Sequence, residues 1–213
     1  MKKAFFITAM AALLGINAYG QDGVSNSSTG IHLGLKAGMN YSNIYDSKSE
    51  EYDAQGKYGV AGGLFLAIPI GRFLGIQPEL MYSQKGYRQS GSFLASNYEF
   101  TRTSHYLDIP LLVSIKPTEV LTIQLGPQFS YLMKQKNVFN TGLGSVTNQN
   151  QFDNDNIRKN TLGAVVGLDF NFNRVVFGTR AGWDLQNNNG DGTSTNPRYK
   201  NVVVQATLGF RLF

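Results

Sequence analysis

Hydrophobic and polar residues alternate along this chain, and the clearest example covers residues 121–133. Odd-numbered positions there are apolar from Leu121 to Met133, whereas most even-numbered positions are polar. Successive side chains of a strand point to opposite faces, so this pattern predicts a strand with one apolar and one polar face. The pattern recurs in eight segments that we predict as strands: 31–44, 57–70, 74–87, 98–115, 121–133, 160–172, 175–185 and 199–213.

The connections between these segments alternate in length. The tight ones lie at 71–73, 116–120 and 173–174, and the long polar ones lie at 45–56, 88–97, 136–159 and 186–197. Bacterial outer-membrane barrels have short periplasmic turns and longer extracellular loops. The sequence therefore predicts an all-β, eight-stranded, antiparallel, up-and-down transmembrane β-barrel. A hairpin hidden in the long fifth connection would raise the count to ten, and a soluble lipocalin-like periplasmic barrel is the alternative.

The first twenty residues have the three parts of a secretory signal peptide. Lys2 and Lys3 are followed by an apolar run to Ile16 and by small residues at Ala18 and Gly20. This run is too short to span a bilayer, and a buried N-terminal helix fits the flanking residues less well. We predict a signal peptide at 1–20, a polar periplasmic tether at 21–30 and an outer-membrane β-barrel at 31–213. The chain has no cysteine, so it forms no disulfide.

Charge and hydropathy agree with a location in the outer membrane. The formal charge is +5, and removal of the two N-terminal lysines leaves +3 on the mature chain. The basic residues are scattered, which argues against a nucleic-acid partner. No mature segment approaches the roughly 18 apolar residues of a transmembrane helix. The slightly negative mean hydropathy fits a barrel, in which half of the strand residues face a polar interior.

Charged residues occur at inward positions of several predicted strands. The interior of an eight-stranded barrel is just wide enough for side chains to fill it, and buried charges must pair. We therefore predict a closed polar network in the barrel interior, formed by Lys36, Glu79, Asp108, Asp169, Arg180 and Arg211. A structural plug is favoured over a gated ion path, because the bore is small.

The residues do not predict a catalytic, cofactor or metal site. The chain has two histidines, His32 and His105, and Ser104 and His105 are expected on opposite faces of one strand. A nucleophile, base and acid triad is therefore not expected. Acidic groups at 50–53 and 153–155 match no calcium-loop spacing, so we expect solvated loops there.

Aromatic residues gather near the ends of the predicted strands. Membrane-spanning barrels carry aromatic girdles at both water interfaces. We assign to these girdles Tyr41, Tyr58, Phe73, Tyr82, Tyr87, Tyr106, Tyr131, Phe170, Phe172, Phe177, Trp183, Tyr199 and Phe210.

Four motifs resemble one known family. They are residues 34–40 (GLKAGMN), 106–112 (YLDIPLL), 126–132 (GPQFSYL) and 208–213 (LGFRLF). Together they resemble the outer-membrane β-barrel domain, PorT-like or "porin family", that is common in Bacteroidota. The resemblance covers about 31–213 and implies an integral outer-membrane protein without catalytic residues.

Three roles are compatible with these observations. The first is a structural, adhesive or interaction role through the long extracellular loops. The second is a small channel, whose unitary conductance steps should change when Glu79 or Arg180 is neutralised. The third, which the resemblance permits, is a protein-secretion-linked outer-membrane factor. Expected partners are outer-membrane lipid, the barrel-assembly machinery during biogenesis, and envelope or secretion proteins.

Overall fold

The computed structural model describes residues 30–45, 54–93, 96–141, 144–150, 158–188 and 199–212. These residues form nine strands: β1 (His32–Tyr45), β2 (Ala54–Pro69), β3 (Leu74–Phe93), β4 (Ser96–Ile115), β5 (Leu121–Thr141), β6 (Gly144–Asn150), β7 (Asn160–Phe172), β8 (Val175–Asp184) and β9 (Lys200–Arg211). Among the described residues, no helix is long and apolar enough to cross a membrane.

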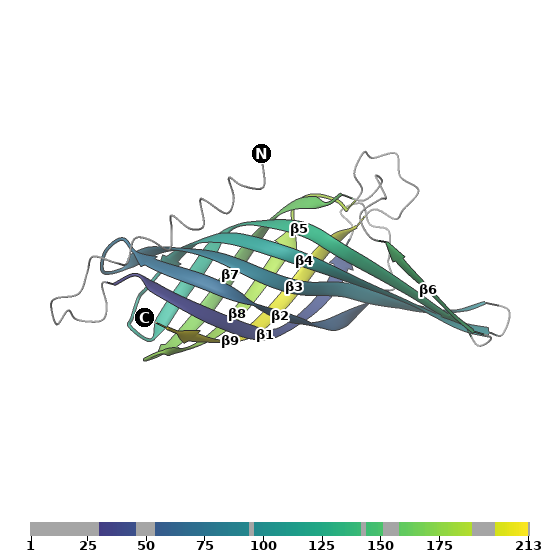
Figure 1. The fold of residues 1–213 in the computed structure, drawn as a ribbon, viewed down its shortest axis with the longest axis horizontal. Coiled ribbons are helices and arrows are strands. Elements are labelled where there is room, and N and C mark those ends of the chain that lie inside the picture. Colours follow the sequence, from purple (N-terminus) through teal and green to yellow (C-terminus); the bar gives the residue numbers. More distant parts are fainter. Residues whose placement is uncertain are drawn as a thin grey trace.

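Eight of the strands form a closed ring (Figure 1). Each strand pairs antiparallel with its neighbours in the order β4-β3-β2-β1-β9-β8-β7-β5, and the pairing of β4 with β5 closes the sheet. Strand β6 pairs with β5 beyond the ring. The predicted eight-stranded, antiparallel, up-and-down barrel is therefore confirmed.

The barrel is apolar outside and polar inside. Along β7, for example, Leu162, Val166 and Leu168 are exposed, whereas Thr161 and Asp169 are buried. The same alternation holds along β4, where Leu111 and Val113 face outward and Ser114 faces inward. A water-soluble sheet would have the reverse arrangement, so the exposed apolar wall is the surface that lipid tails contact. The predicted faces of these strands are confirmed.

Aromatic girdles lie at both ends of the outer wall. Near the long connections the outward aromatics are Tyr41, Tyr58, Tyr82, Tyr131 and Trp183, and near the short turns they are Phe73, Phe172, Phe177 and Phe210. The assignment of three others to the girdles was wrong. Tyr87, Tyr106 and Tyr199 are buried, with 3–5 % of their surface exposed, because their strand positions face the interior.

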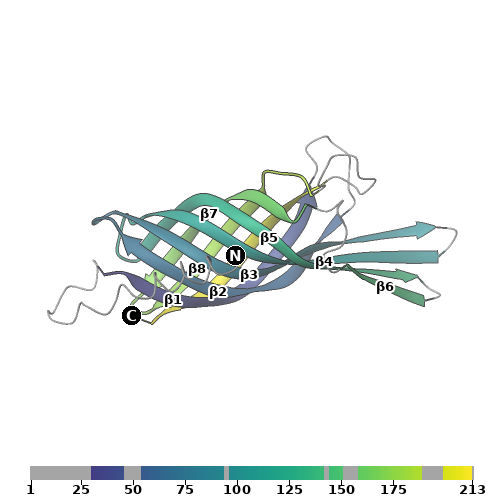
Figure 2. The same ribbon diagram turned by 45° about the horizontal axis from the view of Figure 1, so that its top comes forward.

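Two segments predicted as loops contain strand instead. Strands β3 and β4 continue through most of 88–97, and β5 continues to Thr141 before β6 returns beside it. The fifth connection therefore hides a hairpin, but this hairpin adds no strand to the ring. Figure 2 shows these four strands leaving the barrel wall together. We call this part, residues 88–93, 96–103, 136–141 and 144–150, the projecting sheet.

A bulge in β5 marks where the barrel wall passes into the projecting sheet. Tyr106 pairs with Leu132 and His105 pairs with Lys134, so Met133 has no partner on β4. An extra residue reverses the order of inward and outward positions. Ser130 is buried at an even position before the bulge, and Gln135 is buried at an odd position after it.

The predicted signal peptide at 1–20 and nearly all of the predicted tether at 21–30 lie outside the described residues. Both remain predictions. The acidic groups at 50–53 and 153–155 also lie outside them.

Close approach of neighbouring strands at Gly38 supplies a test of the packing. A Cβ atom at Gly38 would lie 1.9 Å from the carbonyl oxygen of Ala206, whereas one at Gly62 would meet nothing closer than 3.6 Å. We expect Gly38→Ala to lower the free energy of unfolding by about 1–3 kcal/mol through overpacking. Gly62→Ala, on the adjacent strand, is the control and should change it by less than about 0.5 kcal/mol. Urea unfolding in lipid vesicles measures both, and equal effects would contradict the close approach.

Candidate functional site

Glu79 is the centre of the barrel interior. Its side chain is fully buried, and its Oε1 accepts hydrogen bonds from Lys36 Nζ at 2.8 Å and from Arg180 Nη2 at 2.7 Å. Its Oε2 accepts a further bond from Arg180 Nη1 at 2.5 Å. The two cations come from β1 and β8, and the carboxylate comes from β3. This bidentate ion pair therefore ties three strands together across the lumen.

The other predicted network residues lie in separate places. Asp108 pairs with Lys85, at 3.1 Å, and not with the cations around Glu79. Asp169 lies within electrostatic range of Lys36 and Arg180, but its Oδ1 has no hydrogen-bond partner among the described residues. The predicted residues are therefore brought together only in part, because strand register decides which inward side chains share a level.

Arg211 lies towards the short-turn end of the lumen. Its guanidinium donates hydrogen bonds to the side-chain oxygen of Asn171 and to the backbone carbonyl of Asn173. Asn171 in turn donates to Thr122 at 2.9 Å. Arg211 thus bonds a group of neutral side chains that joins β5, β7 and β9, and it makes no direct contact with Glu79 among the described residues.

Several neutral side chains complete the interior and were not among the predicted site residues. Gln124 accepts a hydrogen bond from Arg180 at 2.7 Å, and Gln77 donates one to Glu79 at 2.7 Å. Asn40 links β1 to Ser83 at 2.8 Å and receives a bond from Gln205 at 2.9 Å. All occupy inward positions of their strands, so alternation could have identified them, although not their partners.

Aromatic side chains cluster inside the lumen at the end near the long connections. Ile44, Tyr87 and Tyr199 form a buried cluster, and the rings of the two tyrosines lie 5.6 Å apart, edge to face. The guanidinium of Arg102 lies over both rings, at 5.8 and 5.7 Å from their centroids, and donates to the Tyr199 hydroxyl at 3.1 Å. Cation–π contacts of a desolvated Arg stabilise such a cap.

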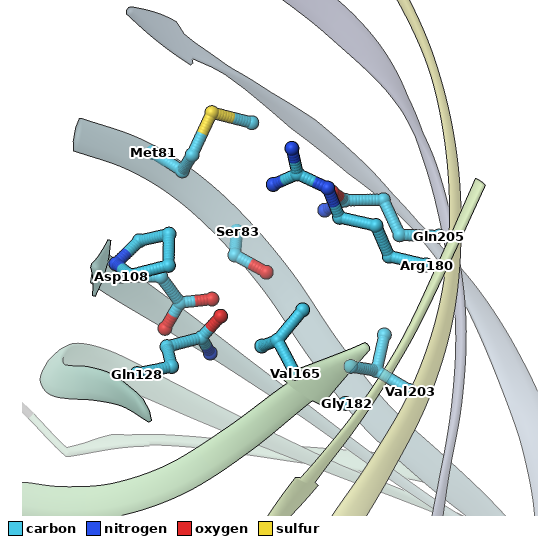
Figure 3. A pocket seen from close by; sticks show the side chains of 10 residues that line it. Met81, Ser83, Asp108, Gln128, Val165, Arg180, Gly182, Val203 and Gln205 are labelled. Atoms are coloured by element: carbon cyan, nitrogen blue, oxygen red, sulfur yellow. The ribbon is translucent and has the colours of Figure 1, made fainter. Parts of the chain in front are cut away.

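A small cavity lies between these layers. Figure 3 shows a cavity at mid-barrel, with Arg180 and Gln205 on one side and Asp108 and Gln128 on the other. Its volume is about 20 Å³, which is room for about one water molecule. Its polar lining residues, among them Asp108, Arg180 and Gln205, already pair or hydrogen-bond with neighbouring side chains, and its other walls are apolar.

The residues considered for catalysis do not meet. Ser104 and Asp108 are buried inside the barrel, whereas His105 faces outward and is hydrogen-bonded to the Tyr82 hydroxyl at 2.6 Å. Within the described ranges, no three His, Asp or Glu side chains gather where they could hold a metal ion.

The projecting sheet has two different faces. One face continues the lumen side of the barrel and carries a row of paired residues from Phe100 through Phe139 to Val146. Phe139 also stacks on Tyr98, with ring centroids 5.8 Å apart. The other face continues the lipid-facing side and is mainly polar. We call the first the aromatic face and the second the outer face.

Comparison with known proteins agrees with this architecture. The sequence model of the family described as "Outer membrane protein beta-barrel domain" matches residues 20–190. Comparison with curated proteins gave no match. Among solved structures, Neisserial surface protein A is similar with a TM-score of 0.50 and 9% identity, over 86% of this chain and 99% of that protein.

Two further solved structures are similar over most of their length. Ail, the attachment invasion locus protein of Yersinia pestis, gives a TM-score of 0.47 at 12% identity, over 85% of this chain and 98% of that protein. The outer membrane protein OprG of Pseudomonas aeruginosa gives 0.42 at 12% identity, over 85% and 94%. Identities this low reflect the fold and carry no functional assignment.

Neutralising Glu79 tests the ion pair. Glu79→Gln removes the carboxylate that both Lys36 and Arg180 bond, and the two buried cations then repel each other, so we expect the free energy of unfolding to fall by about 3–5 kcal/mol. Glu119→Gln, in the exposed turn between β4 and β5, is the matched control and should change it by less than about 0.5 kcal/mol. Urea unfolding followed by Trp183 fluorescence gives both values. A Glu79→Gln midpoint equal to that of the control would contradict the assignment.

Proposed function

The chain belongs to the outer membrane protein β-barrel family and lies in the outer membrane; from this we propose that it is a non-catalytic surface protein that binds partners through its projecting sheet. Short turns of outer-membrane barrels face the periplasm and long connections face outward. The three tight turns therefore lie on the periplasmic side. The projecting sheet, at the opposite end, extends from the cell surface.

The observation that carries this proposal is the aromatic face. Phe139 and Val146 are adjacent on paired strands and remain 41 % and 60 % exposed. They lie beyond the lipid-contacting wall, on the side of the sheet that continues the lumen surface. Exposed aromatic and aliphatic side chains on a rigid sheet are typical of a surface that binds another molecule.

The filled lumen supports an interaction role over a channel. Glu79 with its two cations, the Lys85–Asp108 pair and the cap around Arg102 occupy successive levels of the barrel. The cavity at mid-barrel, about 20 Å³, has room for about one water molecule, which is too little for a hydrated ion. The predicted interior network is thus best understood as a structural plug.

The non-catalytic assignment is supported by the separation of Ser104 and Asp108 from His105 across the barrel wall. The PorT-like resemblance of the four sequence motifs is the basis for the proposals of a Bacteroidota origin and of partners among envelope or secretion proteins. Use of the barrel-assembly machinery during biogenesis is proposed on the same basis.

Polar substitutions on the aromatic face test the proposed function. The double variant Phe139→Ser, Val146→Ser should reduce autoaggregation of cells and their attachment to cultured epithelial cells. Loss of apolar contact area on two side chains predicts a fall of about tenfold or more in binding. Both assays compare cells that display equal amounts of the protein.

The matched control is Asn140→Ser, Thr147→Ser, which changes the two neighbouring positions on the outer face. This control should behave as the wild type. Equal attachment by all three forms, or equal loss in both double variants, would contradict a role for the aromatic face.

A further inference from the structure

Cationic side chains gather on the outer surface of β2–β5, directly beyond the aromatic girdle. The outward positions that follow Tyr82 and Tyr131 along their strands bring basic residues to the base of the projecting sheet. Lys57 joins them, because it lies in the stretch of β2 where the register shifts, between Gly56 and Ala61, and its amine reaches Thr103 on the outer face. The group consists of Lys57, Arg88, His105, Lys134 and Lys136. We call it the basic cluster.

Strand register places these residues side by side. Lys136 lies directly opposite Thr103 on β4, and the amine of Lys57 hydrogen-bonds Thr103 Oγ1 from the other side. Arg88 lies opposite Thr101, two residues further along β4. Neighbouring strands are about 4.8 Å apart and two residues advance about 6.7 Å. The flexible side chains of Lys57, Arg88 and Lys136 can therefore reach one common ligand.

The cluster lacks its own counter-charges in the described part of the protein. The ion pairs there join Lys36, Lys85 and Arg180 to carboxylates, all inside the barrel. The one carboxylate on the outer face of described β2–β5 is Glu99, beyond Arg88, where it accepts a hydrogen bond from Thr101.

Mutual repulsion within the cluster is visible at Lys57. The charges of Arg88 and Lys136 lie close enough to repel its amine. An anion bound between the three cations would relieve this repulsion.

The depth of the cluster in the membrane indicates the kind of anion. Girdle tyrosines such as Tyr58 and Tyr82 mark the level of lipid head groups. The hydroxyl of Tyr82 is hydrogen-bonded to His105, the first member of the cluster beyond the girdle. The cluster thus meets the outer leaflet at the level of its phosphates. Across the ring, β9 brings one outward cation, Lys200, to its corresponding end.

We propose that the basic cluster is a binding site for the phosphate groups of the outer-leaflet glycolipid, in which Lys57, Arg88 and Lys136 hold a lipid phosphate. The bound lipid neutralises the base of the projecting sheet. It also fixes the height of the sheet above the membrane. This site is independent of the aromatic face, which lies on the opposite side of the sheet.

Binding of purified lipid A to the protein in zwitterionic nanodiscs tests the site, with native mass spectrometry as the readout. The wild type should bind bisphosphorylated lipid A and bind the dephosphorylated form, with the same acyl chains, much less. The triple variant Lys57→Gln, Arg88→Gln, Lys136→Gln should bind the phosphorylated form about 100-fold more weakly. The control Lys200→Gln removes one outward cation from the opposite wall and should bind as the wild type does.

Two further measurements separate the alternatives. The charge-preserving variant Lys57→Arg, Lys136→Arg should retain binding, because positive charge at these positions is what the lipid phosphate requires. Inorganic phosphate at millimolar concentration should not displace the lipid. Equal binding of both lipid forms, unchanged binding by the triple variant, an equal loss in Lys200→Gln, loss in the charge-preserving variant, or full displacement by phosphate would each overturn the proposal.

Discussion

The ion pair of Glu79 with Lys36 and Arg180 determines what kind of barrel this is. A buried charge without a partner costs several kcal/mol, so three strands must bring these side chains to one level. Once they meet, the bidentate contact and the neighbouring Gln77 and Gln124 occupy the centre of the lumen. The ring of eight strands therefore reverses the arrangement of a water-soluble protein, with polar contacts in its interior and apolar contacts to lipid on its outer wall.

If side chains fill the lumen, the surfaces available for binding are the outer wall and the projecting sheet. The lipid-facing wall is uniformly apolar. The strands that continue beyond it form the projecting sheet, whose two faces differ in chemistry. In the roles proposed above, exposed Phe139 and Val146 on the aromatic face contact a partner, and Lys57, Arg88 and Lys136 on the outer face contact lipid phosphate. Within the barrel, the alternation of side chains places polar residues in the lumen and apolar residues against lipid. In the projecting sheet, the same alternation places the proposed partner-binding residues on one face and the proposed lipid-binding residues on the other.

The ring and its faces could be predicted from the sequence, because alternation along each strand is a local property. The pairs that inward side chains form could not be predicted, since they depend on the register between strands. Asp108 therefore pairs with Lys85 and not with the cations around Glu79. The projecting sheet was missed because 88–97 and 136–150 are mostly polar and lack the apolar outward positions that identify a lipid-facing strand. The bulge at Met133 also reverses the inward and outward positions there, which conceals the continuation of β5.

A lumen filled by paired side chains should conduct no ions. Single-channel recording in planar bilayers tests it most directly, with the purified wild type and with a variant in which the arginine of the cap, Arg102, and its partner Tyr199 are both replaced by alanine. We expect a flat baseline for the wild type and also for the variant, since the layer around Glu79 still fills the bore. Unitary steps in the wild type, with a conductance that changes when Glu79 is neutralised, would contradict it.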